Sequence, residues 1–153
     1  MTPLFKKLNF KNQPHILVVD HPPSFQSELD AMAEEAEIIT DPAALESITF
    51  CLAFATEQAA IKRQIDALAP RLADDAVIWF CYPKKSSKNY QSDITRDAGW
   101  EPLGEWKLEP VRQVAIDADW SALRFRPVDQ IKSFTRRKSM ALTKEGKKRT
   151  DKN

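Results

Sequence analysis

The chain has 153 residues, of which 42% are hydrophobic and 29% are charged, and its formal net charge is +1. A chain of this length can bury a core without disulfides or metal ions. No apolar stretch approaches the ~18 residues of a membrane-spanning helix, and the first residues lack the apolar segment of a signal peptide. We therefore expect a cytoplasmic protein with no membrane partner.

The charged residues are distributed unevenly along the chain. Residues 132–153 contain nine Lys and Arg against two carboxylates, a charge of +7, which leaves −6 on residues 1–131. This asymmetry is typical of an acidic domain with a basic extension. We predict a single α/β domain over residues 1–131 and a basic, flexible C-terminal tail over residues 132–153.

The first half of the chain alternates between short apolar segments and amphipathic ones. A short helix or arm is expected at 3–8. A buried strand is expected at 15–20, a short second strand at 37–40 and a third, apolar strand at 48–55. The spacing over 24–36 predicts a helix capped by Ser24. A further helix, with Thr56 as its N-cap, would carry the apolar stripe from Ile61 to Leu72.

The second half begins with a fourth apolar strand at 76–82, which Pro83 ends. A polar loop follows, and Asp93 is expected to cap a short helix that contains Ile94. Segments 112–118 and 121–128 alternate apolar and polar residues, which predicts an antiparallel pair. The pattern as a whole predicts a Rossmann-like three-layer α/β sandwich. Its mostly parallel sheet would have five to six strands and a C-terminal antiparallel hairpin.

Glycine is scarce, and none of the three glycines precedes Gly99. A dinucleotide fingerprint or a P-loop needs glycines just after the first strand, where this chain has Asp20-His21-Pro22-Pro23. The usual binding motifs for nucleotides and methyl donors are therefore missing, and no cofactor is predicted. The two cysteines, Cys51 and Cys81, lie in apolar segments and are expected to be buried thiols. With the two histidines they do not give the spacing of a zinc site, so no metal is predicted.

Polar residues gather where the predicted strands end, and ligands of open parallel sheets bind at that carboxyl edge. The candidate ligand-binding residues are Asp20, His21, Lys84, Lys85, Ser86, Ser87, Lys88, Asp117, Asp119, Trp120 and Ser121. The loop from 84 to 88 has the ammonium and hydroxyl groups to hold a phosphate or a carboxylate. A solvated loop is the simpler interpretation.

The other edge residues also allow two interpretations each. Asp117 and Asp119 suit acid–base chemistry or a shared cation, but aspartates are also common in turns. Trp120 would be either a lid over a ligand or a side chain packed onto the domain. His21 would transfer a proton with Asp20 or Asp41, or it would only stabilise the turn.

Three functions remain open. We favour a binding module for an anionic small molecule, or for a protein partner, at the carboxyl edge of the sheet. One alternative is a small enzyme on a degenerate transferase-like Rossmann fold. The other is a nucleic-acid accessory protein, which the acidic domain disfavours. Its tail would contact phosphates through Arg136, Arg137, Lys138, Lys147, Lys148 and Arg149.

Two stretches are distinctive enough to carry a family resemblance. They are Trp79 with Tyr82-Pro83-Lys84-Lys85-Ser86-Ser87-Lys88, and Asp117 with Asp119-Trp120-Ser121-Ala122-Leu123. With weaker pieces from residue 3 to about 126, they resemble a family of small bacterial proteins known only as a domain of unknown function (DUF). The resemblance implies a compact Rossmann-like domain in a bacterial cytoplasm, and it brings no activity or catalytic residue with it. Both stretches fall on the predicted edge.

Overall fold

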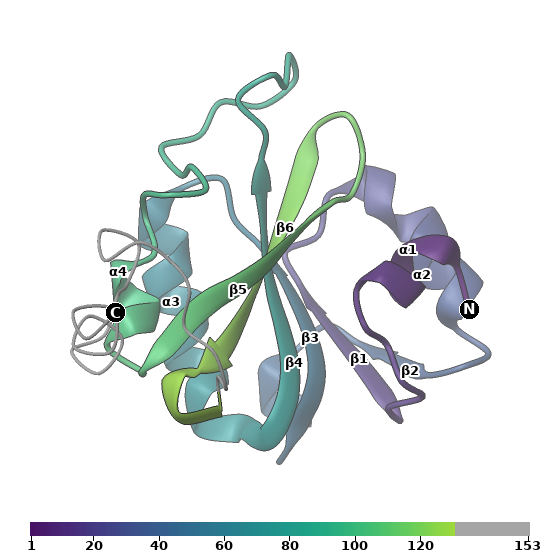
Figure 1. The fold of residues 1–153 in the computed structure, drawn as a ribbon. Helices are drawn as coiled ribbons and strands as arrows, with labels where there is room; N and C mark the ends of the chain where they lie inside the picture. The colour runs from purple at the N-terminus through teal and green to yellow at the C-terminus, as the bar shows by residue number, and fades with distance from the viewer. Residues whose placement is uncertain (131–153) are drawn as a thin grey trace.

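A six-stranded sheet forms the centre of the protein (Figure 1) in the computed structural model, which describes residues 1–130. The strand order is β2-β1-β3-β4-β6-β5. Neighbouring strands among β1 to β4 pair in parallel, whereas β6 is antiparallel to both β4 and β5. The Rossmann-like α/β prediction, with its C-terminal hairpin, is confirmed. The strands are β1 (His15–Val19), β2 (Glu37–Ile39), β3 (Ile48–Phe54), β4 (Leu72–Pro83), β5 (Leu108–Ala115) and β6 (Trp120–Pro127).

Helices cover both faces of this sheet, so the molecule has three layers. Figure 1 shows α1 and α2 on one side and α3 and α4 on the other. The helices are α1 (Pro3–Lys7), α2 (Gln26–Met32), α3 (Gln58–Leu68) and α4 (Glu101–Gly104). Short 3₁₀ turns lie at η1 (Pro23–Phe25), η2 (Pro42–Ala44), η3 (Ala69–Arg71) and η4 (Val128–Gln130).

Strand β4 shows why the core has two halves. Successive side chains of a strand point to opposite faces of the sheet. Trp79 and Cys81 therefore join the core around Phe5 and α2, while Phe80 joins the core around α3. The indole Nε1 of Trp79 donates a hydrogen bond of 2.8 Å to the carbonyl of Leu8, which holds the end of α1 against the sheet.

Both predicted ends of α2 were wrong. Ser24 lies in the 3₁₀ turn that follows Pro22, and α2 begins only at Gln26 without a side-chain cap. Pro22 is extended, as a residue that precedes a proline usually is, and Pro23 begins the 3₁₀ turn that continues directly into α2. This helix also ends at Met32 instead of near residue 36.

The N-terminus of α3 receives its cap from a distant part of the chain. Its N-cap residue is Glu57, not Thr56, and no local side chain caps it. Instead, Oδ1 of Asp93 accepts a 2.8 Å hydrogen bond from the backbone N–H of Gln58. The helix predicted after Asp93 does not form, and the next helix is α4. Asp93 is thus a helix cap, but for a helix that precedes it by 35 residues.

Burial accounts for the state of the two cysteines. Both are free thiols with no exposed surface. Burial raises the pKa of Cys51. It also raises the pKa of Cys81, with smaller contributions from Cys51 and Asp117.

No helix within residues 1–130 is long and apolar enough to cross a bilayer.

Replacement of Asp93 by Ala should destabilise the protein, because the backbone N–H of Gln58, the first residue of α3, loses its acceptor. The expected loss in the free energy of unfolding is about 1 kcal/mol, measured by urea denaturation. Thr56→Ala is the matched control, since it removes the cap that the local sequence suggests, and it should cost clearly less. An equal loss in both variants would contradict the long-range cap.

Thiol labelling should separate the folded protein from the unfolded one. We expect an aromatic disulfide reagent to react negligibly with the native chain at pH 8, because a buried thiol with a raised pKa is rarely a thiolate. In concentrated urea both of the chain's cysteines should react rapidly. Rapid labelling of one equivalent without denaturant would show that a cysteine is accessible and would contradict the burial.

Candidate functional site

The carboxyl end of β4 and the turn between β5 and β6 lie side by side at one edge of the sheet. Pro83 of β4 is opposite Trp120 of β6 in the antiparallel register. One residue further, the backbone N–H of Lys84 donates to the carbonyl of Asp119 over 2.7 Å. The two distinctive stretches of the sequence therefore meet here.

Asp119 fastens the lysine loop, defined as residues 84–92, to this turn. Its Oδ1 accepts a 2.8 Å hydrogen bond from the hydroxyl of Ser87, and its Oδ2 accepts one of 3.0 Å from Asn89. The Ser87 hydroxyl oxygen in turn accepts from the backbone N–H of Tyr90, at 3.2 Å. Both oxygens of this carboxylate thus have structural partners.

Asp117 has a similar role inside the turn. Its Oδ1 accepts hydrogen bonds from the backbone N–H groups of Asp119 and Trp120, at 2.8 and 2.9 Å. This is the arrangement of an aspartate that stabilises a tight turn. The geometry favours the turn interpretation of both aspartates over an acid–base pair.

Trp120 is packed into the domain and does not form a lid. Its side chain is only 3% exposed, and its ring contacts those of Phe54 and Tyr90 at centroid distances of 5.2 and 4.9 Å. Ser121, the next residue, is also buried. Neither residue lines the cavity described next.

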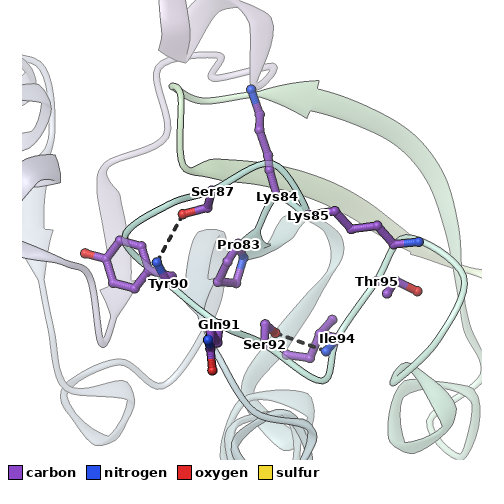
Figure 2. Close-up of a pocket in the computed structure, with 9 residues that line it drawn as sticks. All are labelled: Pro83, Lys84, Lys85, Ser87, Tyr90, Gln91, Ser92, Ile94 and Thr95. Carbon is purple, nitrogen blue, oxygen red and sulfur yellow. Dashed lines mark hydrogen bonds between the residues drawn. The ribbon is translucent and has the colours of Figure 1, made fainter.

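A cavity of about 550 Å³ lies against the lysine loop (Figure 2). Lys84 and Lys85 are both lining residues, and no carboxylate lines the cavity. The side chains of these two lysines extend in different directions, with that of Lys85 reaching toward Thr95 (Figure 2). We call this space the lysine cavity; it is lined by Pro83, Lys84, Lys85, Ser87, Tyr90, Gln91, Ser92, Ile94 and Thr95.

Sequence reasoning named only part of this wall. Ser86 and Lys88 belong to the predicted loop but do not line the cavity. The residues it missed, from Tyr90 to Thr95, follow the loop in the chain. Their one signal was a run of polar side chains beyond residue 88, which also describes any surface loop. The hydroxyl oxygens of Ser92 and Thr95 accept local backbone N–H bonds at 3.0 and 3.3 Å. A hydroxyl that accepts a hydrogen bond can also donate one.

The remaining edge candidates surround the end of β1, at the point where the strand order reverses. Asp20 has a positive φ of 57°, and its Oδ2 accepts a 3.1 Å hydrogen bond from Nε2 of Gln64 on α3. His21 Nε2 is 2.9 Å from Oε1 of Gln26, so this ring is engaged with α2 and not with Asp20. Asp41 caps the 3₁₀ turn η2 through the N–H of Ala43.

Two further predictions concern metals and the tail. Within residues 1–130, the structure places no three His, Cys, Asp or Glu side chains where they would hold a metal ion together. The proposed nucleic-acid contacts, Arg136, Arg137, Lys138, Lys147, Lys148 and Arg149, lie outside the described residues.

Comparison of the sequence with protein-family models and with curated proteins gave no match. Solved structures do resemble the fold. The pyocyanin biosynthetic protein PhzM has a TM-score of 0.50 and 12% identity, over 80% of this chain and 52% of PhzM. At this identity the likeness shows a Rossmann-like fold and nothing finer, and the chain spans about half of PhzM.

Two other solved structures are similar at lower TM-scores. A TehB-like SAM-dependent methyltransferase from Corynebacterium glutamicum has a TM-score of 0.45 and 10% identity, over 81% of this chain and 85% of its own. A fibrillarin pre-rRNA processing protein from Methanococcus jannaschii has a TM-score of 0.48 and 17% identity, over 76% and 67%.

Removal of the Asp119 carboxylate should release the lysine loop. We expect Asp119→Ala to lower the free energy of unfolding by about 1 kcal/mol, since two side-chain hydrogen bonds are lost near the surface. Trypsin should then cleave the native chain after Lys84, Lys85 or Lys88 severalfold faster than in wild type. Asp97→Ala, a change in an exposed loop carboxylate, should leave these cleavage rates unchanged; equal rates in both variants would argue against the fastening role.

Proposed function

We propose that this protein binds a small anionic molecule in the lysine cavity. The observation that carries the proposal is the charge of its wall. Two lysines and several hydroxyl groups surround about 550 Å³ without a carboxylate, whereas residues 1–131 as a whole carry −6. A cationic hollow on an acidic domain concentrates anions that the rest of the surface repels.

The wall supplies donors and a rigid frame rather than a nucleophile. Lys85 extends toward Thr95 (Figure 2), so an ammonium group and a hydroxyl proton approach the same region. Ser92 adds a second hydroxyl. Asp119 holds the loop through Ser87 and Asn89, so part of the ordering cost of binding is already met in the folded protein. A carboxylate or phosphate is the chemical class that such donors bind.

The TehB-like neighbour is described as dependent on S-adenosylmethionine. The residues at the end of β1 do not suit binding of this molecule. Binding at this turn usually relies on glycines and on backbone N–H groups. Here Asp20 takes the left-handed conformation and engages Gln64. Pro22 and Pro23 follow, and neither has an N–H to donate. The proposed ligand is therefore one that uses the lysine cavity instead.

A panel of anions tests the proposal on the full chain. Dicarboxylates, sugar phosphates and nucleotides would be screened by thermal melting, followed by calorimetry for any that bind. A ligand at ~100 times its Kd adds roughly 2.7 kcal/mol, which is several degrees for a domain of this size. Lys85→Ala should then weaken binding about tenfold, because a charged hydrogen bond is lost.

Lys88→Ala is the matched control for this measurement. It removes the same charge from the same loop, but Lys88 does not line the cavity. We expect it to change the affinity by less than about twofold, since exposed charges are screened by salt. Equal weakening by both variants, or binding that survives Lys85→Ala, would overturn the placement in the cavity. A panel without any binder would overturn the proposal itself.

The second candidate is a small transferase, which the fold comparisons favour as a class. The specific observation behind it is the position of Asp20 and Gln64, because ligands of open α/β sheets bind where the strand order reverses. Direct titration with S-adenosylmethionine separates the two candidates. Binding that Asp20→Asn weakens and Lys85→Ala leaves intact would favour the transferase. Absence of binding would favour the anion-binding protein.

A further inference from the structure

Three arginines lie together on one face of the β5–β6 hairpin, away from the lysine cavity. Arg112 of β5 is directly opposite Arg124 of β6 in the register. Arg126 follows Arg124 by two residues, so it points to the same face of the strand. This face is the one that Trp120 and Ala122 of β6 share with the core around Phe5. We call Arg112, Arg124 and Arg126 the arginine cluster.

The arrangement is electrostatically unfavourable without an anion. Like charges directly opposite each other in a sheet destabilise it. Burial lowers the pKa of Arg124, and the neighbouring charges of Arg126 and Arg112 lower it further. The partly buried Arg124 also has an Nε with no hydrogen-bond partner within residues 1–130. An anionic acceptor bound at Arg124 would satisfy this buried donor and reduce the repulsion among the three positive charges.

The protein groups around the cluster satisfy it only in part. Arg112 donates from Nη1 to the side-chain oxygen of Asn9 over 3.0 Å. Glu109 is opposite Arg126 in the register, and its carboxylate offsets at most one of the three positive charges. A net positive charge therefore stays on this face of an otherwise acidic domain.

We propose that the arginine cluster is a second anion site, and that it binds a phosphate group. Guanidinium groups are planar and donate two parallel hydrogen bonds, a geometry that matches phosphate oxygens. Three of them suit an anion with more than one negative charge. None of the three lines the lysine cavity. Arg124 lies beside Trp79, four residues before Pro83 on β4, which is roughly 13 Å along the strand.

The phosphate has two chemical sources, a free phosphate compound or the backbone of a nucleic acid, and two probes distinguish them. The full chain would be titrated with inorganic pyrophosphate and with a single-stranded oligonucleotide of mixed sequence, both at low salt. Each titration would be repeated with Arg124→Gln and with Arg63→Gln. Arg63 is an exposed arginine of α3, so its variant controls for the loss of one positive charge.

We expect Arg124→Gln to weaken pyrophosphate binding about tenfold or more, and Arg63→Gln to weaken it less than about twofold. If Arg124→Gln instead weakens binding of the oligonucleotide, a nucleic acid backbone is the source of the phosphate. The melting temperature of Arg124→Gln should equal or exceed that of wild type, since a like-charge contact is removed. The proposal is overturned if neither probe binds, or if Arg124→Gln and Arg63→Gln weaken both probes equally.

Lys85→Ala keeps the two proposals apart. It should not change pyrophosphate affinity at the arginine cluster, because the cluster and the lysine cavity share no residue. If Lys85→Ala removes pyrophosphate binding while Arg124→Gln does not, the phosphate site is the lysine cavity and the cluster proposal fails. If Arg124→Gln removes pyrophosphate binding while Lys85→Ala does not, the cluster proposal is supported, whether or not the lysine cavity binds an anion.

Discussion

The two-sided pairing of β4 is the constraint on which the candidate site depends. This strand pairs in parallel with β3 and antiparallel with β6, and its last eight residues are buried. Its register decides which residue leaves the sheet beside the β5–β6 turn. A slip of one residue would turn Trp79 away from the carbonyl of Leu8, and it would separate Lys84 from Asp119. Core packing and the position of the lysine loop are therefore set by the same strand.

Local patterns predicted the strands in their order along the chain, but not the ends of the helices or the starts of β4 and β5. Short apolar segments predict buried parallel strands because both faces of such strands are covered. This held for β1, β3 and the second part of β4, whereas β2, at the edge of the sheet, is only partly buried. A cap depends on which acceptor reaches a particular N–H. For Gln58 that acceptor is Asp93, 35 residues later. The local sequence predicts Thr56 as the cap, because Asp93 comes close to Gln58 only in the folded protein.

The candidate site shows the same division. Parallel topology places the lysine loop at the carboxyl edge, and the sequence places the Asp-Trp turn there only if β5 runs in the same direction as β4. The two segments meet because β6 pairs with β4 in antiparallel register. The path of that loop depends on Asp119, whose two oxygens hold Ser87 and Asn89. This path brings Thr95 to the cavity wall and leaves Lys88 outside it. No spacing in the chain encodes such a path.

The arginine cluster lay beyond sequence reasoning for a different reason. Arg112 is opposite Arg124 in the register that the β5–β6 turn sets, which also pairs Val114 with Ala122 and Ala115 with Ser121. The register shift lies beyond this contact, between Pro110 and Arg112. Alternation of apolar and polar residues predicts that two segments pair, but not which residues are opposite each other. A contact between like charges destabilises the sheet unless a ligand, or a charge from elsewhere, compensates for it.

The two cationic sites differ in the geometry of the donor groups that they offer to an anion. Lys85 carries a point charge on a flexible side chain, whereas Arg112 has a planar guanidinium with several donors, one of which binds Asn9. Trp79, which is opposite Arg124, and Pro83, which lines the lysine cavity, are separated by roughly 13 Å along β4. This spacing is comparable with the Debye length of about 10 Å at 0.1 M salt, so salt weakens the electrostatic coupling between the two sites. At lower salt the −6 charge of residues 1–131 opposes both, so affinity there depends on direct hydrogen bonds rather than on the long-range field.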